Sequence, residues 1–413
     1  MRQSKIEPSS RYHPSMRVIA LVVPALMAIM NSAPAEPRQD RSALLRIAPI
    51  DTPTAQESGQ PQLSVSSRGV LLSWVERSGS EAALKFAERT PSGWTAPRTV
   101  AKGTGWFINW ADVPSVTRLD DGTLVGHWLQ KSGEATYAYD VRLSHSTDDG
   151  RTWSPSFTPH TDGTKTEHGF ATLFQMPGAG LGLVWLDGRN MKGDMSLRFA
   201  SYTRGWKQTA EISLDARVCE CCPTTVAITS EGPIVAYRDR SAEEIRDIYV
   251  ARLEKGKWTA PKAAHAEGWQ VNACPVNGPA LSARGRDVAL AWFSAKGNKP
   301  MSYVALSSDA GRTFGPPVRL DDEASLGRVD VELLPDGSAL AAYMEFAEQK
   351  GQLRVRRVRP DGSKSEASIV AGMAGNRSSG YPRMALHGDE VVFAWTDREA
   401  GSQVKTAVAP IPR

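Results

Sequence analysis

One strand-like pattern recurs seven times along the chain, and it constrains the fold more than any other feature of the sequence. Each copy is a short apolar run that ends in an aromatic residue, and successive aromatic residues are 51 to 57 positions apart. Such even spacing is typical of a radial β array and not of a series of unlike domains. The aromatic residues are Trp74, Trp128, Trp185, Tyr237, Trp292, Tyr343 and Trp395.

Each repeat contains strand-like runs on both sides of the aromatic one. One run precedes it, one follows it, and a fourth comes after a turn such as Gly93 to Pro97. A lone four-stranded sheet of this size cannot bury both of its faces, so the units must pack face to face in a closed ring. The sequence therefore predicts an all-β fold: a single β-propeller of four-stranded antiparallel blades, with seven blades favoured.

The last repeat, from Tyr381 to Pro410, has only three strand-like runs. The orphan run from Ala43 to Ile50 is the candidate for its fourth strand. Pairing of this N-terminal strand with the last repeat would join the two ends of the chain and remove an open sheet edge.

The N-terminal residues have the pattern of a secretory signal peptide. An apolar run at residues 18–30 follows an arginine and precedes an Ala-Pro-Ala motif, and its 13 residues are short of the roughly 20 that span a bilayer. We expect residues 1–35 to be cleaved and residues 36–413 to form the periplasmic or secreted propeller, without membrane insertion. Translation from Met1 and translation from Met16 both remain open.

Composition excludes several classes of protein. Of the 413 residues, 23% are charged and 41% are hydrophobic, which argues against a long disordered chain and against a polytopic membrane protein. The net charge of +4 is too small to indicate a nucleic-acid groove, so we expect no nucleic-acid partner. No P-loop, H-E-x-x-H or G-x-S-x-G motif occurs, and we expect a monomer without a cofactor.

Two turns share the pattern S-x-D-x-G-x-T-[WF], at residues 146–153 and 307–314. In such a turn the Asp carboxylate can accept backbone N–H bonds, the Gly supplies positive φ, and the aromatic ring packs between sheets. The pattern resembles the Asp box, or BNR repeat, of the sialidase superfamily. The residues that carry it are Ser146, Asp148, Gly150, Trp153, Ser307, Asp309, Gly311 and Phe314.

The resemblance implies that these boxes are structural and lie opposite the substrate face. The substrate face would be built from the loops that enter each first strand and leave each second strand. True sialidases have six blades, which keeps six as an alternative, and they hold the substrate carboxylate with three arginines, use a Tyr–Glu nucleophile and protonate the leaving group from an Asp. Their N-terminal F-R-I-P motif is replaced here by residues 61–64, Pro-Gln-Leu-Ser.

By strand position the resemblance implies a set of catalytic candidates. The alternative is that the arginines and aspartates of this set, named below, form salt bridges that connect the loops of neighbouring blades. The candidates are Arg238, Arg328 and Arg383 for the arginine cluster, Tyr381 for the nucleophile and Asp187 or Asp239 for the acid, with Arg240 beside them.

Four cysteines precede the first strands of two adjacent repeats. Cys219, Cys221 and Cys222 lead into the fourth repeat and Cys274 into the fifth, and the two Cys-Pro pairs are 52 residues apart, one repeat length. In an exported protein the simplest expectation is two disulfides, Cys222 with Cys274 and Cys219 with Cys221. A soft-metal site, for an ion such as Cu(I), is the alternative.

Two functions follow from the sequence. The first is an exported sialidase-like glycoside hydrolase that acts on acidic glycans through an arginine-rich central funnel. The ligand of that funnel is a glycan or another small anionic molecule. The alternative is a non-catalytic propeller that binds a glycan, a protein partner or a soft metal through the Cys-rich loops.

Overall fold

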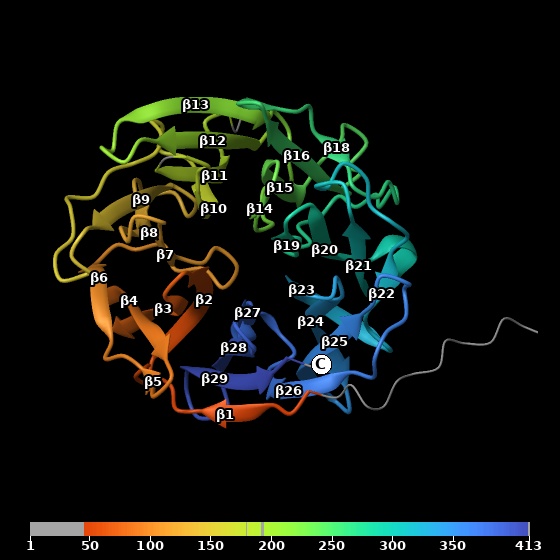
Figure 1. Cartoon of the computed structure of the whole chain (residues 1–413). Helices are drawn as coiled ribbons and strands as arrows, with labels where there is room; N and C mark the ends of the chain where they lie inside the picture. Colours follow the sequence, from red (N-terminus) through yellow and green to blue (C-terminus); the bar gives the residue numbers. More distant parts are fainter. Residues whose placement is uncertain (1–44, 179, 191–193, 412–413) are drawn as a thin grey trace, which may run out of the picture. The chain divides into compact units, whose positions relative to one another are not determined.

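The computed structural model describes residues 45–178, 180–190 and 194–411. Seven antiparallel sheets are arranged around a central axis (Figure 1), so the repeat count predicts the number of blades correctly and the six-bladed alternative is excluded. The expected signal peptide lies outside the described residues. Among the residues described, no helix is both long and apolar enough to span a membrane.

Blades are numbered here in chain order, each with its inner strand first. Blade 1 contains β2 (Ser58–Ser66), β3 (Gly69–Ser78), β4 (Glu81–Thr90), β5 (Gly93–Trp94) and β6 (Arg98–Gly103). Blade 2 contains β7 (Ser115–Arg118), β8 (Leu124–Lys131) and β9 (Tyr139–Ser146). Blade 3 contains β10 (His168–Gln175), β11 (Leu181–Asp187), β12 (Ser196–Tyr202) and β13 (Gln208–Asp215).

The other four blades follow the same scheme. Blade 4 contains β14 (Thr225–Thr229), β15 (Gly232–Arg238), β16 (Ile248–Glu254), β17 (Lys257–Trp258) and β18 (Lys262–Ala263). Blade 5 contains β19 (Ala280–Arg284), β20 (Asp287–Ser294), β21 (Met301–Ser307) and β22 (Val318–Arg319). Blade 6 contains β23 (Ala324–Leu333), β24 (Ala339–Ala347), β25 (Lys350–Val358) and β26 (Ser368–Met373), and blade 7 contains β27 (Arg383–His387), β28 (Glu390–Asp397), β29 (Gln403–Pro410) and β1 (Ala48–Ile50).

Blade 2 departs from the four-stranded scheme. It has three strands and isolated bridges; in one of these, Phe157 pairs with Leu143 of β9, where a fourth strand would lie. The fourth strand is thus reduced to a single pair on the outer side of this blade.

The seven repeated aromatic residues are buried where neighbouring blades meet. Trp74, Trp185 and Trp292 are at most 1% exposed, and each of the other four is at most 8% exposed. Apolar clusters join one blade to the next; one, for example, joins Trp292 of blade 5 to Ile234 of blade 4. The core therefore consists of a series of layers between sheets, as expected for blades that cannot bury their faces alone.

The N-terminal strand closes the ring. β1 pairs antiparallel with β29, with Ala48 opposite Val408 and Ile50 opposite Thr406. This confirms the predicted pairing of the two chain ends, although the strand covers only the last part of the predicted run. Figure 1 shows β1 on the outer side of β29.

The two Asp-box-like turns have the same hydrogen bonds. In the first, the amide of Gly150 donates to Ser146 Oγ at 2.9 Å, and the amide of Thr152 donates to Asp148 Oδ1 at 2.9 Å. Gly150 has φ of 78°, and a Cβ there would lie 2.6 Å from the ring of Phe86 in blade 1. The second turn repeats these bonds around Ser307, Asp309, Gly311 and Thr313, ahead of Phe314.

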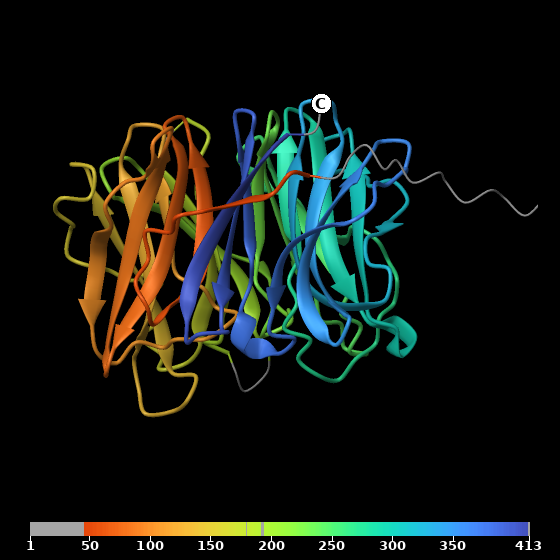
Figure 2. The ribbon, with the colours of Figure 1, turned by 90° about the horizontal axis from the view of Figure 1, so that it is seen from below.

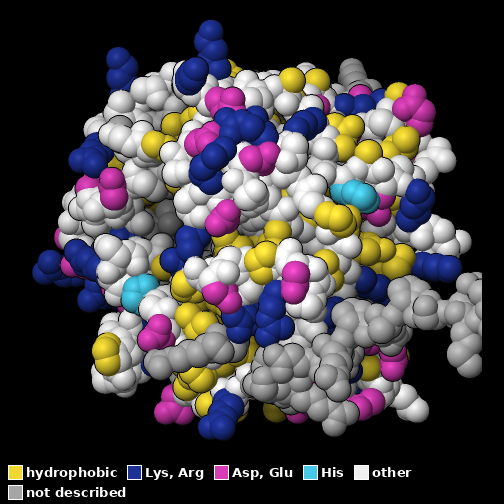
Figure 3. Space-filling model, turned by 45° about the vertical axis from the view of Figure 1, so that its right-hand side comes forward, with side chains coloured by type: hydrophobic (Ala, Val, Ile, Leu, Met, Phe, Trp, Pro, Cys, Tyr) yellow, Lys and Arg dark blue, Asp and Glu magenta, His cyan; other side chains and the backbone are white. Residues whose placement is uncertain are grey.

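The strand order defines two faces. The loops that enter the first strands and leave the second strands lie together on one of them, which we call the entry face. The 3-10 turns η2 (Lys296–Asn298) and η3 (Arg377–Ser379) belong to it and lie at the lower edge of Figure 2. The Asp-box-like turns, between third and fourth strands, lie on the opposite face. Figure 3 shows basic and acidic side chains intermingled on the side that it draws.

Candidate functional site

Arg238, at the end of β15, is buried and its donors are used within the protein. It is 1% exposed, and its guanidinium donates to the carbonyl oxygens of Asn277 at 2.9 and 3.0 Å, Arg246 at 2.6 Å and Phe293 at 2.7 Å. The group also lies 4.9 Å from the ring centroid of Trp269. These contacts join blades 4 and 5, and they leave no fork of donors facing solvent.

Arg328 is held in a bulge of β23 with φ of 52°. Its guanidinium donates to Asn376 O at 2.9 Å and to Ser379 Oγ, and it lies 5.0 Å from the ring of Trp110. Arg328 is only 6% exposed, so its charge is directed into the junction between blades 6, 7 and 2.

Tyr381 and Arg383 lie at the central channel. The Tyr381 hydroxyl donates to Val276 O at 2.6 Å, and its ring is 2% exposed. Arg383 lines a channel of about 230 Å³ together with Asp330 and Glu332. Burial, with the nearby Asp330 carboxyl, raises the pKa of Glu332 to about 8. The guanidinium of Arg383 lies 5.4 Å from the ring centroid of Tyr381, and its Nε has no hydrogen-bond partner among the described residues.

Asp239 and Arg240 directly follow β15. Burial, together with the carboxyl of Asp215, raises the pKa of Asp239 to about 7. Arg240 forms an ion pair with Glu244, Nη2 to Oε1 at 2.7 Å. These residues lie near the cysteines, whereas Asp187 belongs to the separate cluster in blade 3.

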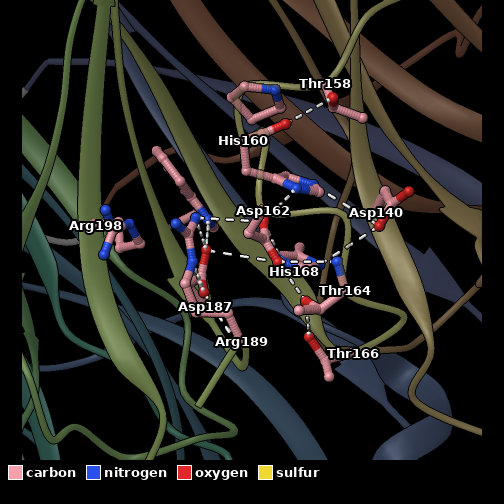
Figure 4. A network of polar contacts seen from close by, with 12 residues as sticks. Asp140, Thr158, His160, Asp162, Thr164, Thr166, His168, Asp187, Arg189 and Arg198 are labelled. Atoms are coloured by element: carbon pink, nitrogen blue, oxygen red, sulfur yellow. Dashed lines mark hydrogen bonds and ion pairs between the residues drawn. The ribbon is translucent and has the colours of Figure 1, made fainter. Parts of the chain in front are cut away.

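Asp187 belongs to a polar network that Figure 4 shows from close by. Arg189 donates to both of its carboxylate oxygens, at 2.7 and 2.8 Å. The rings of His160 and His168 stack with centroids 3.7 Å apart and planes 5° apart. His160 Nδ1 lies 3.0 Å from an oxygen of Asp162, and His168 is fully buried.

The geometry of the network fits a protonated histidine surrounded by carboxylates better than a metal ion bound by both histidines. His168 lies 3.4 Å from Asp140 and from Asp162 and 3.8 Å from Asp187. Burial opposes the charge of His168, but these carboxylates prevail and raise its pKa. Since the lone pair of an imidazole nitrogen lies in the ring plane, two parallel rings do not converge on one ion.

A second buried cluster contains two carboxyl groups and one phenol. The hydroxyl of Tyr139 lies 2.9 Å from Asp112 Oδ2 and 2.9 Å from Glu167 Oε1. Asp112 and Glu167 are 1% and 8% exposed, and burial raises the pKa of each to about 7. Asp112 Oδ1 also accepts the backbone amide of Phe170. This cluster joins blade 3 to the loop ahead of blade 2.

The cysteines form a compact group at the boundary of blades 4 and 5. The Sγ atoms of Cys219 and Cys222 are 3.4 Å apart, those of Cys219 and Cys221 3.7 Å, and those of Cys221 and Cys222 4.0 Å. Hydrogen bonds from Cys221 and Cys222 hold the pKa of Cys219 well below its usual range. Cys274 is exposed, with Sγ 3.7 Å from Glu220 Oε1. All four thiols are free in the structure, so neither expected disulfide is present.

A pocket of about 150 Å³ opens on the entry face where blades 7, 1 and 2 meet. Arg77, near the end of β3, and Arg398, directly after β28, line it together with Trp110, Asn109 and Gln60. Both arginines are exposed, and neither forms an ion pair with a described residue. Burial and the charge of Arg77 lower the pKa of Arg398. The pocket therefore presents two guanidinium groups whose charges have no carboxylate partner within salt-bridge distance.

The fold and its polar entry face define a divergent β-propeller. No family model matches the sequence, and no curated protein matches it. Among solved structures, the fold is similar to that of a Dyadobacter fermentans protein of unknown function, with a TM-score of 0.52 and 14% sequence identity. The aligned region covers 91% of this chain and 99% of the other. It is also similar to the fold of the polysaccharide lyase Uly1, with a TM-score of 0.55 and 11% sequence identity. The aligned region covers 86% of this chain and 90% of the other.

The comparison with a sialidase is weaker. The NanB sialidase of Streptococcus pneumoniae has a TM-score of 0.47 and 9% identity, over 91% of this chain and 99% of the other. At such identities these similarities concern the fold alone.

Sequence reasoning placed the charged loops together on one face, as the strand order has them, but it missed several groups of interacting side chains. Asp112, Tyr139 and Glu167 belong to no motif, and neither do His160 and Asp162. The only signal for these residues was their position shortly before or within blade strands, where many residues of a propeller lie.

Proposed function

We propose that the protein is an exported propeller that binds an acidic glycan in the pocket lined by Arg77 and Arg398. The observation that carries the proposal is the pair of guanidinium groups that line one cavity from neighbouring blades without a carboxylate partner among the described residues. Nε of Arg398 donates to Ser378 O at 2.8 Å. Guanidinium forks match carboxylate and sulfate groups, and such charge-assisted bonds are stronger than neutral ones. The partly buried ring of Trp110 adds an aromatic surface beside them.

Binding fits this pocket better than hydrolysis does. The described lining holds no carboxyl group and no tyrosine, whereas a glycosidase needs an acid and a nucleophile or base beside the scissile bond. Of the arginines that the sialidase resemblance implied, Arg238 and Arg328 donate to groups within the protein, and Arg383 lines the central channel and not this pocket. That the polysaccharide lyase Uly1 has a similar fold supports a glycan as the class of ligand.

The two Asp-box-like turns support a distant place in the sialidase superfamily. They have the same internal hydrogen bonds, and they occupy equivalent positions in blades 2 and 5. We assign them the structural role that the resemblance implies, since neither turn lies on the entry face.

The test is titration of the purified propeller with uronic-acid, sialic-acid and sulfated oligosaccharides, each compared with a neutral oligosaccharide of equal length. Arg77→Gln and Arg398→Gln should each weaken binding of the acidic ligand by about tenfold or more, because each removes a charge-assisted contact of about 1.5–3 kcal/mol. Arg286→Gln is the matched control, because Arg286 is exposed on the opposite face.

Equal affinity for neutral and acidic oligosaccharides would contradict the proposal, and so would two variants that bind like the wild type. Release of sugar during the same incubations would indicate a hydrolase or lyase and not a binding protein.

Export is tested separately. Fractionation of cells that express the full chain should place a shortened protein, beginning near Glu36, in the periplasm or the medium. A full-length protein confined to the cytoplasm would refute the signal-peptide prediction.

A further inference from the structure

We propose that Cys219, Cys221 and Cys222 bind one Cu(I) ion at the boundary of blades 4 and 5. This site lies apart from the pocket of Arg77 and Arg398, and it stands whether or not that pocket binds a glycan. Three observations carry it: the spacing of the sulfur atoms, the charge around them, and the way the loop is fixed.

The spacing of the sulfur atoms is that of ligands around a shared ion. Thiolates about 2.3 Å from a metal are about 3.8 Å from one another in a tetrahedral arrangement and about 4.0 Å in a trigonal one. The three Sγ separations are 3.4, 3.7 and 4.0 Å. Only a small adjustment of the side chains is therefore needed for all three sulfurs to contact one ion.

Two buried arginines, Arg238 and Arg246, lie near the sulfur atoms and can offset the charge of thiolates. Arg238 is buried, and its donors contact only carbonyl oxygens; no carboxylate of the described chain lies within salt-bridge distance of it. Arg246 is also buried and donates to Cys219 Sγ at 3.2 Å, while Glu220 and Glu244 hold it in place. A buried charge without an anionic partner is costly, so thiolates near Arg238 would relieve an imbalance that the fold otherwise carries.

Neighbouring elements fix the loop. The amide of Cys219 donates to Arg238 O at 3.0 Å, and the amide of Asn277 in blade 5 donates to Cys222 Sγ at 3.4 Å. Gly278 lies so close to the loop that a Cβ there would be 2.1 Å from Pro223 O. Two of the sulfurs are therefore held in place before any ion arrives.

The donor set favours Cu(I). Soft thiolates select Cu(I), whereas structural zinc is almost always bound by four ligands. The three ligand sulfurs range from buried to partly exposed: Cys219 and Cys222 are 1% exposed, and Cys221 is partly exposed. Cys274 is exposed next to Glu220, near Cys221, and it is not one of the three sulfurs grouped above. Binding exchanges thiol protons for the ion, with the protons released to solvent and no electron transferred.

The test uses the mature protein, reduced and kept free of oxygen, and titrated with Cu(I) against a chromogenic Cu(I) chelator. One Cu(I) per chain should bind, and X-ray absorption should show about three sulfurs at about 2.3 Å. Cys219→Ser and Cys222→Ser should each weaken Cu(I) binding by at least about tenfold. Cys274→Ser tests whether the exposed thiol beside Cys221 is a ligand; for a site of three sulfurs it should retain the stoichiometry and the sulfur shell.

Circular dichroism and metal-free melting curves of each variant separate loss of the site from loss of the fold. A folded Cys222→Ser variant that binds Cu(I) as the wild type does would overturn the proposal. The same holds for zinc binding without Cu(I) binding, for loss of Cu(I) in Cys274→Ser, and for a Cys219–Cys222 disulfide that forms in the exported protein and prevents binding.

Discussion

The buried cluster of Asp112, Tyr139 and Glu167 makes a sharp prediction about stability. A phenol has one proton, so Tyr139 can donate to only one of the two carboxyl groups that lie 2.9 Å from its oxygen. The second contact is attractive only when that carboxyl is protonated and donates to the phenol oxygen. The geometry thus requires one carboxylic acid in the folded state, in agreement with the raised pKa of both groups.

The substitution Glu167→Gln keeps the shape of the acid and supplies a permanent donor. Burial raises the pKa of Glu167 from 4.5 to about 7, which corresponds to about 3 kcal/mol of stability lost once the carboxyl ionises. Since the folded-state pKa is the higher one, the wild type should be most stable below about pH 4, lose stability as the pH rises to about 7, and change little above that. The Gln variant should lack this loss.

The measurement is urea denaturation, followed by tryptophan fluorescence between about pH 4 and about pH 8. The variant should equal the wild type at the acidic end and exceed it by about 3 kcal/mol at the alkaline end. Glu134→Gln, at an exposed loop position, is the control and should change the free energy of unfolding by less than about 0.5 kcal/mol at every pH. A Glu167→Gln variant that is less stable than the wild type at about pH 8 would refute the argument.

Three further predictions concern the scaffold. Arg238→Met leaves three buried carbonyl oxygens without their donors and should cost about 3–5 kcal/mol in urea denaturation; a cost below about 1 kcal/mol would contradict the role given to this residue. Gly278→Ala should destabilise the fold by about 1–3 kcal/mol through its clash with Pro223, whereas Gly372→Ala, which meets no atom within 4 Å, should cost less; equal costs would be the contrary result. Removal of the residues up to Ile50 opens the ring and should lower the melting temperature by about 5 °C or more, unless β1 contributes nothing to closure.

The sequence by itself determined the architecture of this protein. The spacing of aromatic residues such as Trp74 and Trp292 predicted seven sheets, and the missing strand of the last repeat predicted the closing role of the run that ends at Ile50. Both patterns are local, because alternation of apolar residues reports which side of a strand is buried regardless of what lies elsewhere. The turns at Asp148 and Asp309 were predictable for the same reason, since their hydrogen bonds close within a few residues.

Only the tertiary structure decided which charged residues are available to a ligand. Arg238 and Arg398 both end or follow the second strand of a blade, yet one is enclosed by carbonyl oxygens of the next blade and the other faces a pocket. The grouping of Tyr139 with Asp112 and Glu167 was equally hidden. The partner of a charged group depends on loops from adjacent blades, and those meet only when the ring closes, whereas the apolar repeat is complete within each blade.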